Sequence, residues 1–99
     1  MTKYKLKINP QINKQLEQHG RFIAQVSNSA ATRFQNDFKI ILRQISSNPY
    51  QFPPYDNPAF PENTYRKALF AKWYKVIFLV DGDTVYLEAV IDGRQDSGI

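Results

Sequence analysis

Residues 65–96, YRKALFAKWYKVIFLVDGDTVYLEAVIDGRQD, decide the fold of this 99-residue chain. A first apolar run, residues 65–70, breaks at residues 71–72. Two longer runs, 73–80 and 84–91, are rich in β-branched and aromatic residues and flank an Asp-Gly-Asp turn. A glycine-containing turn between runs rich in β-branched and aromatic residues is typical of a β-hairpin. The stretch therefore predicts three consecutive antiparallel strands.

The basic excess of the chain lies in the same stretch. The chain has 13 Lys and Arg and 9 Asp and Glu, a net charge of +4. Between positions 62 and 81 there is no acidic residue. The basic residues in that interval are Arg66, Lys67, Lys72 and Lys75. Such a cluster indicates an acidic partner, nucleic acid or an acidic peptide, with plain solubilising charge as the alternative.

Length and composition exclude several classes of protein. At 42% hydrophobic content, residues 1–99 predict one small domain with one core. The chain contains no cysteine and a single histidine, which excludes disulfides and thiolate or multi-histidine metal sites. We expect no metal and no cofactor. No apolar run reaches the roughly 18 residues of a membrane span and no signal segment opens the chain, so we expect a cytoplasmic protein without a membrane partner.

The N-terminal half predicts one strand and two helices. Residues 2–8 alternate apolar residues with lysine, as an edge strand with a lysine-bearing face does. Asn9 and Pro10 then start a helix. Its apolar stripe is Ile12, Leu16, Ile23 and Val26. After a short link, residues 29–46 predict a second helix, antiparallel to the first. Its stripe is Ala31, Phe34, Phe38, Ile41 and Ile45.

Residues 48–63 contain five of the six prolines and four aromatic residues. Proline at this density rules out a regular helix or a central strand. We interpret the segment as an ordered strap over the edge of the core. A functional loop is the alternative, because structureless loops of this length often carry function.

Strict alternation assigns two faces to the C-terminal hairpin. The predicted core side is Tyr74, Val76, Phe78, Val80, Val85, Leu87, Ala89 and Ile91. The opposite side, which we expect to be an exposed binding face, carries Trp73, Lys75, Ile77, Leu79, Tyr86, Glu88 and Asp92. The whole order predicts an α+β fold, β-α-α-β-β-β. A helical hairpin packs on one face of a mainly antiparallel four-stranded sheet.

This layout, with YRK at 65–67, YKVIF at 74–78 and GRQD at 93–96, resembles the RelE/ParE toxins of bacterial type II toxin–antitoxin modules, the plasmid stabilisation family. The resemblance spans nearly the whole chain. It implies a RelE-like fold and a growth-inhibiting toxin neutralised by a cognate antitoxin, whose disordered tail folds as it binds. RelE-like members cut mRNA in the ribosome, whereas ParE-like members inhibit DNA gyrase by binding it.

The resemblance also implies roles for individual residues. Arg66 is similar to the basic residue of the first central strand. Lys75 is similar to the arginine that contacts the scissile phosphate, and Arg94 to the arginine that stabilises the transition state. Lys75 and Arg94 are catalytic only if the chain is a ribonuclease. The full set of candidate residues for binding a target or a phosphate is Arg66, Lys67, Lys72, Trp73, Lys75, Tyr86, Arg94 and Asp96.

Departures from the ribonuclease pattern favour the ParE-like branch. Ala68 stands where ribonucleases tend to carry a second basic residue, and Lys75 lacks the bidentate fork of arginine. No tyrosine or histidine follows Arg94. The remaining acid–base candidates are Tyr86, Glu88, Asp92 and Asp96. We therefore expect gyrase inhibition without catalysis. A ribosome-dependent mRNA endoribonuclease is the first alternative, and a non-toxic basic nucleic-acid-binding domain the second.

Four smaller predictions complete the analysis. His19, without a second histidine, is expected to be a solvated helix residue rather than a catalytic one. Arg66 and Lys67 should point to opposite faces of their strand. Arg94 and Asp96 are expected either to form an ion pair that ends the sheet or to belong to the site. The antitoxin should lie along the helical hairpin and the open sheet edge, and the oligomeric state stays open.

Overall fold

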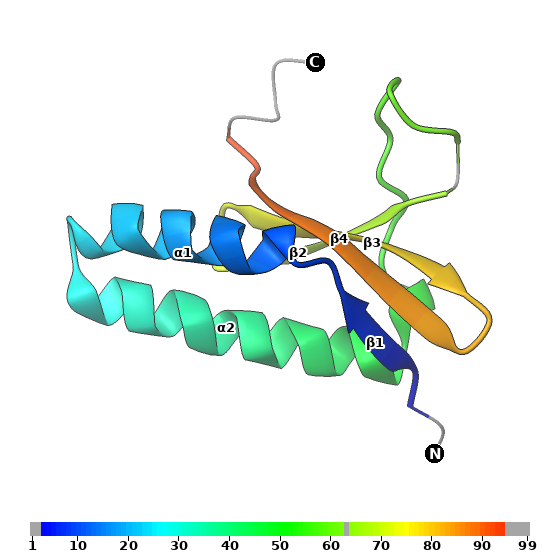
Figure 1. The fold of residues 1–99 in the computed structure, drawn as a ribbon, viewed down its shortest axis with the longest axis horizontal. Coiled ribbons are helices and arrows are strands. Elements are labelled where there is room, and N and C mark those ends of the chain that lie inside the picture. Colours follow the sequence, from blue (N-terminus) through cyan, green and yellow to red (C-terminus); the bar gives the residue numbers. More distant parts are fainter. Residues whose placement is uncertain (1–2, 63, 95–99) are drawn as a thin grey trace.

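The computed structural model describes residues 3–62 and 64–94 (Figure 1). In chain order the elements are β1 (Lys5–Ile8), α1 (Gln11–Ala24), α2 (Asn28–Ser47), the short 3-10 helix η1 (Pro49–Gln51), β2 (Arg66–Phe70), β3 (Tyr74–Asp81) and β4 (Thr84–Asp92). The predicted α+β order of one strand, two helices and three strands is confirmed.

The four strands form one mixed sheet in the order β1-β4-β3-β2. Strands β2, β3 and β4 are antiparallel neighbours, and β1 runs parallel to β4 at the edge. The helical hairpin of α1 and α2 covers one face of this sheet (Figure 1). The predicted edge strand is therefore present, and the sheet is mainly antiparallel as expected.

The apolar stripe of α2 forms the helical half of the core. Phe34, Phe38, Ile41 and Ile45 are buried. They pack against the sheet residues Ala68, Phe70, Tyr74, Val76, Phe78, Val85, Leu87 and Val90. Each fully buried large side chain contributes about 1.5–3 kcal/mol through the hydrophobic effect. At the start of α2, the Ser27 hydroxyl accepts a hydrogen bond from the Ala30 N–H at 3.1 Å.

The stripe predicted for α1 is wrong at its end. Ile12 is fully buried, but Val26 lies beyond the last residue of the helix, Ala24, and is 87% exposed. The helix stops two residues before the point to which the apolar spacing extends. Val26 therefore belongs to the tip of the helical hairpin and not to the core.

A β-bulge in β4 overturns the predicted assignment of faces. Ile77 pairs with Ala89, whereas the next residue, Phe78, pairs with Leu87, so Glu88 is an extra residue in β4. An extra residue moves every later side chain to the other face of the strand. Val90 and Asp92 therefore face the helices, with 1% and 8% exposure, and Ala89 and Ile91 do not. The predictions for Ala89, Ile91 and Asp92 were wrong for this reason.

Beyond the bulge, side chains of α1 replace a strand as the partner of β4. Pairing with β1 ends at Leu87. Next along β4, Gln11 Nε2 donates to the Glu88 carbonyl oxygen at 2.6 Å. The Val90 N–H donates to Gln15 Oε1 at 2.8 Å, and His19 Nε2 lies 3.2 Å from the Val90 carbonyl oxygen. We call residues 11, 15 and 19 the α1 row, because a spacing of four places them on one face of the helix.

The proline-rich segment is a strap, as predicted. The Tyr55 N–H donates to the Tyr65 carbonyl at 2.8 Å, and the Lys67 N–H donates to the Pro53 carbonyl at 3.1 Å. These bonds attach the strap to the start of β2, and the segment rises beside the sheet (Figure 1). Tyr55 is buried, as is Ile77, on the face without helices. The prediction that Ile77 is exposed was wrong because the strap shields part of that face.

Replacing Gln15 by alanine should destabilise the protein, because the Val90 N–H loses its acceptor. We expect the free energy of unfolding in urea to fall by about 1–3 kcal/mol. Gln18→Ala, an exposed position on the same helix, is the control and should change it by less than about 0.5 kcal/mol. Equal effects of the two substitutions would contradict a specific role of the α1 row.

Candidate functional site

The chain leaves the sheet through a close backbone contact at Gly93. Its N–H donates to the Trp73 carbonyl oxygen at 2.6 Å. A Cβ atom at position 93 would lie 2.6 Å from the same oxygen, which is shorter than any tolerated contact. Glycine is therefore required here. The contact fixes the end of β4 beside the turn between β2 and β3, and so fixes the position of Arg94.

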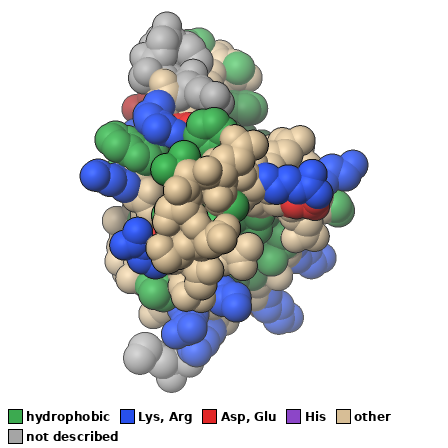
Figure 2. Space-filling model, turned by 90° about the vertical axis from the view of Figure 1, so that its left-hand side faces the viewer, with side chains coloured by type: hydrophobic (Ala, Val, Ile, Leu, Met, Phe, Trp, Pro, Cys, Tyr) green, Lys and Arg blue, Asp and Glu red, His purple; other side chains and the backbone are tan. Residues whose placement is uncertain are grey.

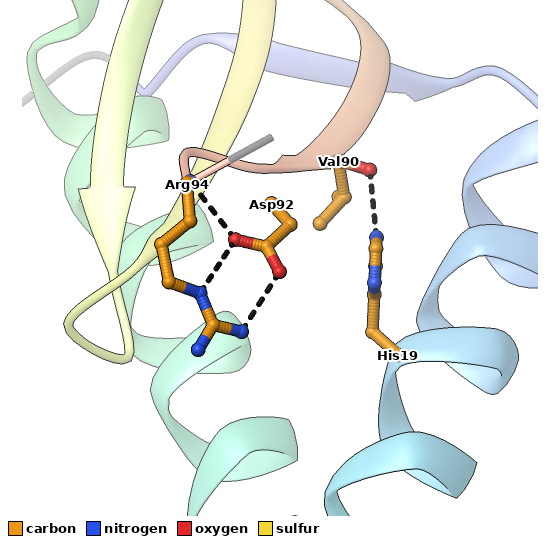
Figure 3. A network of polar contacts seen from close by, with 4 residues as sticks. All are labelled: His19, Val90, Asp92 and Arg94. Carbon is orange, nitrogen blue, oxygen red and sulfur yellow. Dashed lines mark hydrogen bonds and ion pairs between the residues drawn. The ribbon is translucent and has the colours of Figure 1, made fainter. Parts of the chain in front are cut away.

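Arg94 folds back onto the last residue of β4, Asp92 (Figure 3). Its Nε donates to Asp92 Oδ1 at 3.1 Å, a terminal guanidinium nitrogen donates to Oδ2 at 2.8 Å, and its backbone N–H donates to Oδ1 at 3.0 Å. Two parallel charge-assisted bonds of this kind define direction as well as energy. Because Asp92 is buried on the helix side of the sheet, the guanidinium is held on that side.

The ion pair and burial together shift the pKa values of Asp92 and Tyr74. The hydrogen bond from Arg94 holds the pKa of the Asp92 carboxyl below its usual value, although burial acts in the opposite direction. Burial raises the pKa of the Tyr74 hydroxyl, and the negative charge of Asp92 adds to that effect. At neutral pH the site therefore contains a carboxylate, a guanidinium and a neutral phenol.

His19 belongs to this cluster, contrary to the expectation that it is a solvated helix residue. Its ring is half-buried and lies 4.9 Å from the ring of Tyr74, centroid to centroid. Figure 3 shows it directed from α1 toward the Val90 carbonyl, next to Asp92. The sequence signal that predicts this position is the spacing of four from Gln11 to Gln15 to His19.

Two cationic side chains lie against the ring of Trp73. The Nζ atom of Lys72 and the Cζ atom of Arg94 each lie 5.3 Å from its ring centroid. Both distances are within the range of a cation–π interaction. The indole remains 45% exposed. The structure therefore brings three of the predicted site residues, Lys72, Trp73 and Arg94, together on one surface.

This surface borders a groove of about 600 Å³ between the helical hairpin and the β2–β3 turn, which we call the tip groove. It is lined by apolar side chains of both helices and the turn, together with basic side chains. The lining residues include Phe22, Val26, Arg33, Asp37, Lys72, Trp73 and Arg94.

The other predicted site residues lie elsewhere. Lys75 is on the strap side of β3, with its Nζ 5.9 Å from the Tyr55 ring centroid. Arg66 is on the helix side of β2, where a terminal nitrogen donates to the Phe52 carbonyl at 2.7 Å. Lys67 is the next residue of β2 and so faces the strap side. The prediction that Arg66 and Lys67 have opposite orientations is thus consistent with the register of β2 and β3.

Tyr86 and Asp96 do not join the described cluster. Tyr86 is near the start of β4, beside Lys7 of β1, with 5.9 Å between the Lys7 Nζ and the ring centroid. Six residues of strand, about 20 Å, separate Tyr86 from Asp92. Asp96 lies outside the described residues, as does the predicted pair of Arg94 with Asp96. Within residues 3–62 and 64–94, the carboxylate bound to Arg94 is that of Asp92.

Two further properties bear on the kind of site. Across the described ranges, no group of three or more His, Asp or Glu side chains is placed to hold a metal ion. No helix in these ranges is both long and apolar enough to cross a membrane.

A comparison with protein families identifies the family. The family described as ParE toxin of type II toxin-antitoxin system, parDE, matches residues 6–97. The chain belongs to this ParE toxin family. No curated protein matches the chain. Family membership makes this chain the toxin of a type II toxin–antitoxin system, and it implies a cognate antitoxin as partner.

The Asp92–Arg94 pair should make the stability of this ParE-family toxin depend on acidity. The folded-state pKa of Asp92 lies below the unfolded value of about 3.9. The pair therefore stabilises the fold above that value, and the contribution is lost as pH falls through the folded pKa. Asp92→Asn should lower the free energy of unfolding at neutral pH and remove this acid-dependent part.

Urea titrations between about pH 7 and pH 2 measure both effects. Asp56→Asn in the strap, at an exposed carboxylate, serves as the control. The difference between wild type and Asp92→Asn should shrink toward the acid end of the range. A difference that stays constant over the whole range would contradict the role given to the carboxylate charge.

Proposed function

We propose that this toxin arrests growth by binding DNA gyrase, without cutting RNA. The observation that carries the proposal is the match of residues 6–97 to the ParE family. Two features of the fold support it, and both concern the groups that RNA cleavage would need.

The first feature is the position of Ala68. Ribonucleases that the chain resembles tend to carry a basic residue at this point of the first central strand. Here Ala68 has no exposed surface and faces α2 in the core. A long cation at this position would need burial without a partner, which is strongly unfavourable. The core of this chain is therefore built around a small apolar residue where those enzymes use a charge.

The second feature is that Lys75 and Arg94 are directed to opposite faces of the sheet. Stabilising a pentacoordinate phosphorane requires cations that converge on one phosphate. Arg94 is held on the helix side of the sheet by Asp92, whereas Lys75 lies on the strap side near Tyr55. The fork of Arg94 is also already engaged by a carboxylate. This arrangement supports binding more than catalysis.

The surface around Trp73 has the composition of a protein-binding site. Tryptophan and arginine are enriched among the residues that contribute most to protein–protein affinity. Trp73 is accessible and is flanked by Lys72 and Arg94. Viewed from the helical-hairpin tip, Lys and Arg side chains predominate over acidic ones, with apolar side chains between them (Figure 2). Gyrase is the target that the family branch favours. The cognate antitoxin would neutralise the toxin by competing with gyrase for this surface or by changing the shape of the surface.

The decisive experiment induces the toxin alone and maps the ends of an abundant transcript by primer extension. We expect growth arrest with intact transcripts, and inhibition of purified gyrase in a supercoiling assay. Lys75→Ala should keep full activity, whereas Trp73→Ala should weaken inhibition about tenfold or more, because it removes a central aromatic contact.

Other outcomes would replace the proposal. Cuts within translated reading frames that require Lys75 and Arg94 would establish the ribosome-dependent endoribonuclease. Absence of arrest, with binding of the purified chain to nucleic acid, would support the non-toxic basic domain. Restored growth on co-expression of the antitoxin is expected for either toxin mechanism and serves as the control for specific toxicity.

A further inference from the structure

A second groove crosses the edge of β4 beyond the bulge. It lies between the α1 row, the second half of β4 and the strap, and has a volume of about 590 Å³. We call it the edge groove. Among the described residues, none lines both this groove and the tip groove. Its volume is within the range of small-molecule sites, roughly 300–1,000 Å³.

The edge groove is acidic although the chain as a whole is basic. Of the 99 residues, 13 are Lys or Arg. None of these is among the described residues that line the edge groove, whereas Glu88 and Asp92 line it. The Asp92 carboxylate is bound by Arg94, so its charge is compensated. The other ion pairs within residues 3–62 and 64–94 use Asp83 and Glu17, which leaves the charge of Glu88 without a cation in these ranges.

Three aromatic rings stand beside these carboxylates. Tyr55 and Phe60 of the strap and Tyr65 at its end line the edge groove. The ring centroid of Phe60 lies 4.8 Å from that of Tyr65 and 6.2 Å from that of Tyr55. A turn holds Phe60 there, because the Ala59 N–H donates to Asn57 Oδ1 and the Phe60 N–H to the Asn57 carbonyl, each at 2.9 Å. The Phe60 ring is thus fixed in place and still 40% exposed.

Rings of this kind attract cations through the negative charge of their faces. The structure contains one such contact at the same cluster, since the Nζ atom of Lys75 lies 5.9 Å from the Tyr55 ring centroid. Lys75 does not line the edge groove. The rings of Phe60 and Tyr65 that face the groove therefore offer the same kind of contact to a ligand.

The α1 row adds an oriented hydrogen-bond acceptor. Gln11 Nε2 donates to the Glu88 carbonyl oxygen. A carbonyl oxygen only accepts, so this bond fixes which way the Gln11 amide is turned. Its Oε1 atom is left as the acceptor for a group that enters the groove. A carboxylate and an amide oxygen next to aromatic rings are the partners that a protonated amine needs.

We propose that the edge groove binds a small organic cation, an aliphatic amine of the polyamine class. Its ammonium groups would pair with the Glu88 carboxylate and Gln11 Oε1, and its methylene chain would lie against Phe60 and Tyr65. A bare metal ion suits the groove less well, because aromatic rings supply no oxygen ligands. A nucleotide suits it less well too, because its phosphate would need basic side chains, and the described lining has none.

The proposal depends on neither gyrase nor the antitoxin, so its test uses the full-length toxin alone. Calorimetric titration at constant ionic strength should show saturable binding of 1,4-diaminobutane with a Kd of about 1 mM or below, and tighter binding of spermidine. Non-specific attraction is disfavoured, because the chain itself carries a net charge of +4. At ten times its Kd, the amine should raise the Tm by about 5 °C. The neutral 1,4-butanediol has the same chain length and should not bind.

Substitutions with matched controls locate the site. Glu88→Gln keeps the size of the side chain and removes its charge, so it should weaken amine binding about tenfold. Glu62→Gln, at an exposed strap carboxylate outside the groove, is its control. Phe60→Leu removes one ring and should weaken binding about threefold. Phe22→Leu, at a ring that is 59% exposed outside the groove, is the control for that loss.

Four results would overturn the proposal. The first is the absence of saturable binding up to about 10 mM amine. The second is equal binding of the diol, and the third is full amine affinity in both Glu88→Gln and Phe60→Leu. The fourth is tighter binding of N-acetylarginine amide than of either amine, which would assign the groove to an arginine side chain of a protein partner.

Discussion

The bulge at Glu88 is the constraint on which the rest of the structure depends. One extra residue in β4 turns Val90 and Asp92 toward the helices, and pairing of β4 with β1 ends at the residue before the bulge. The α1 row then supplies the missing hydrogen bonds from Gln11, Gln15 and His19. Without that row, backbone groups of β4, two of them partly buried, would lose these hydrogen-bond partners. The bulge and the row are thus one device, formed by residues that lie more than 70 positions apart in the chain.

The same device positions the surface proposed for partner binding. Because the bulge buries Asp92 on the helix side, its carboxylate draws Arg94 to that side, over Trp73. Gly93 allows the backbone contact with Trp73 that brings Arg94 beside the indole ring. The result is a basic and aromatic surface at the hairpin tip, while Lys75 stays on the other face. A regular β4 would place the carboxylate of Asp92, and the guanidinium bound to it, on the strap side.

Local patterns predicted most of the fold. The stripe of α2, the hairpin turn, the edge lysines and the proline strap each depend on a few neighbouring residues, and each is present. The bulge was missed because Glu88 is neither glycine nor proline; the one local departure is the apolar run Ala89–Ile91, in which Val90 interrupts the alternation. The error then spread to Ala89, Ile91 and Asp92. His19 was missed for a related reason: its partners are β4 and Tyr74, and only the spacing of the α1 row indicates them. In the site, Lys72, Trp73 and Arg94 lie together because β3 pairs with β4. No local sequence pattern indicates that pairing.

The closing of the sheet edges has a consequence for the behaviour of the free chain in solution. A bare strand edge is a template on which other chains can add strands and aggregate. Here β1 presents lysines, the second half of β4 is covered by the α1 row, and the start of β2 is bound by the strap. Prolines 53 and 54, which lie at that point, resist further strand addition. At these positions a toxin released from its complex therefore carries its own protection against aggregation by strand addition.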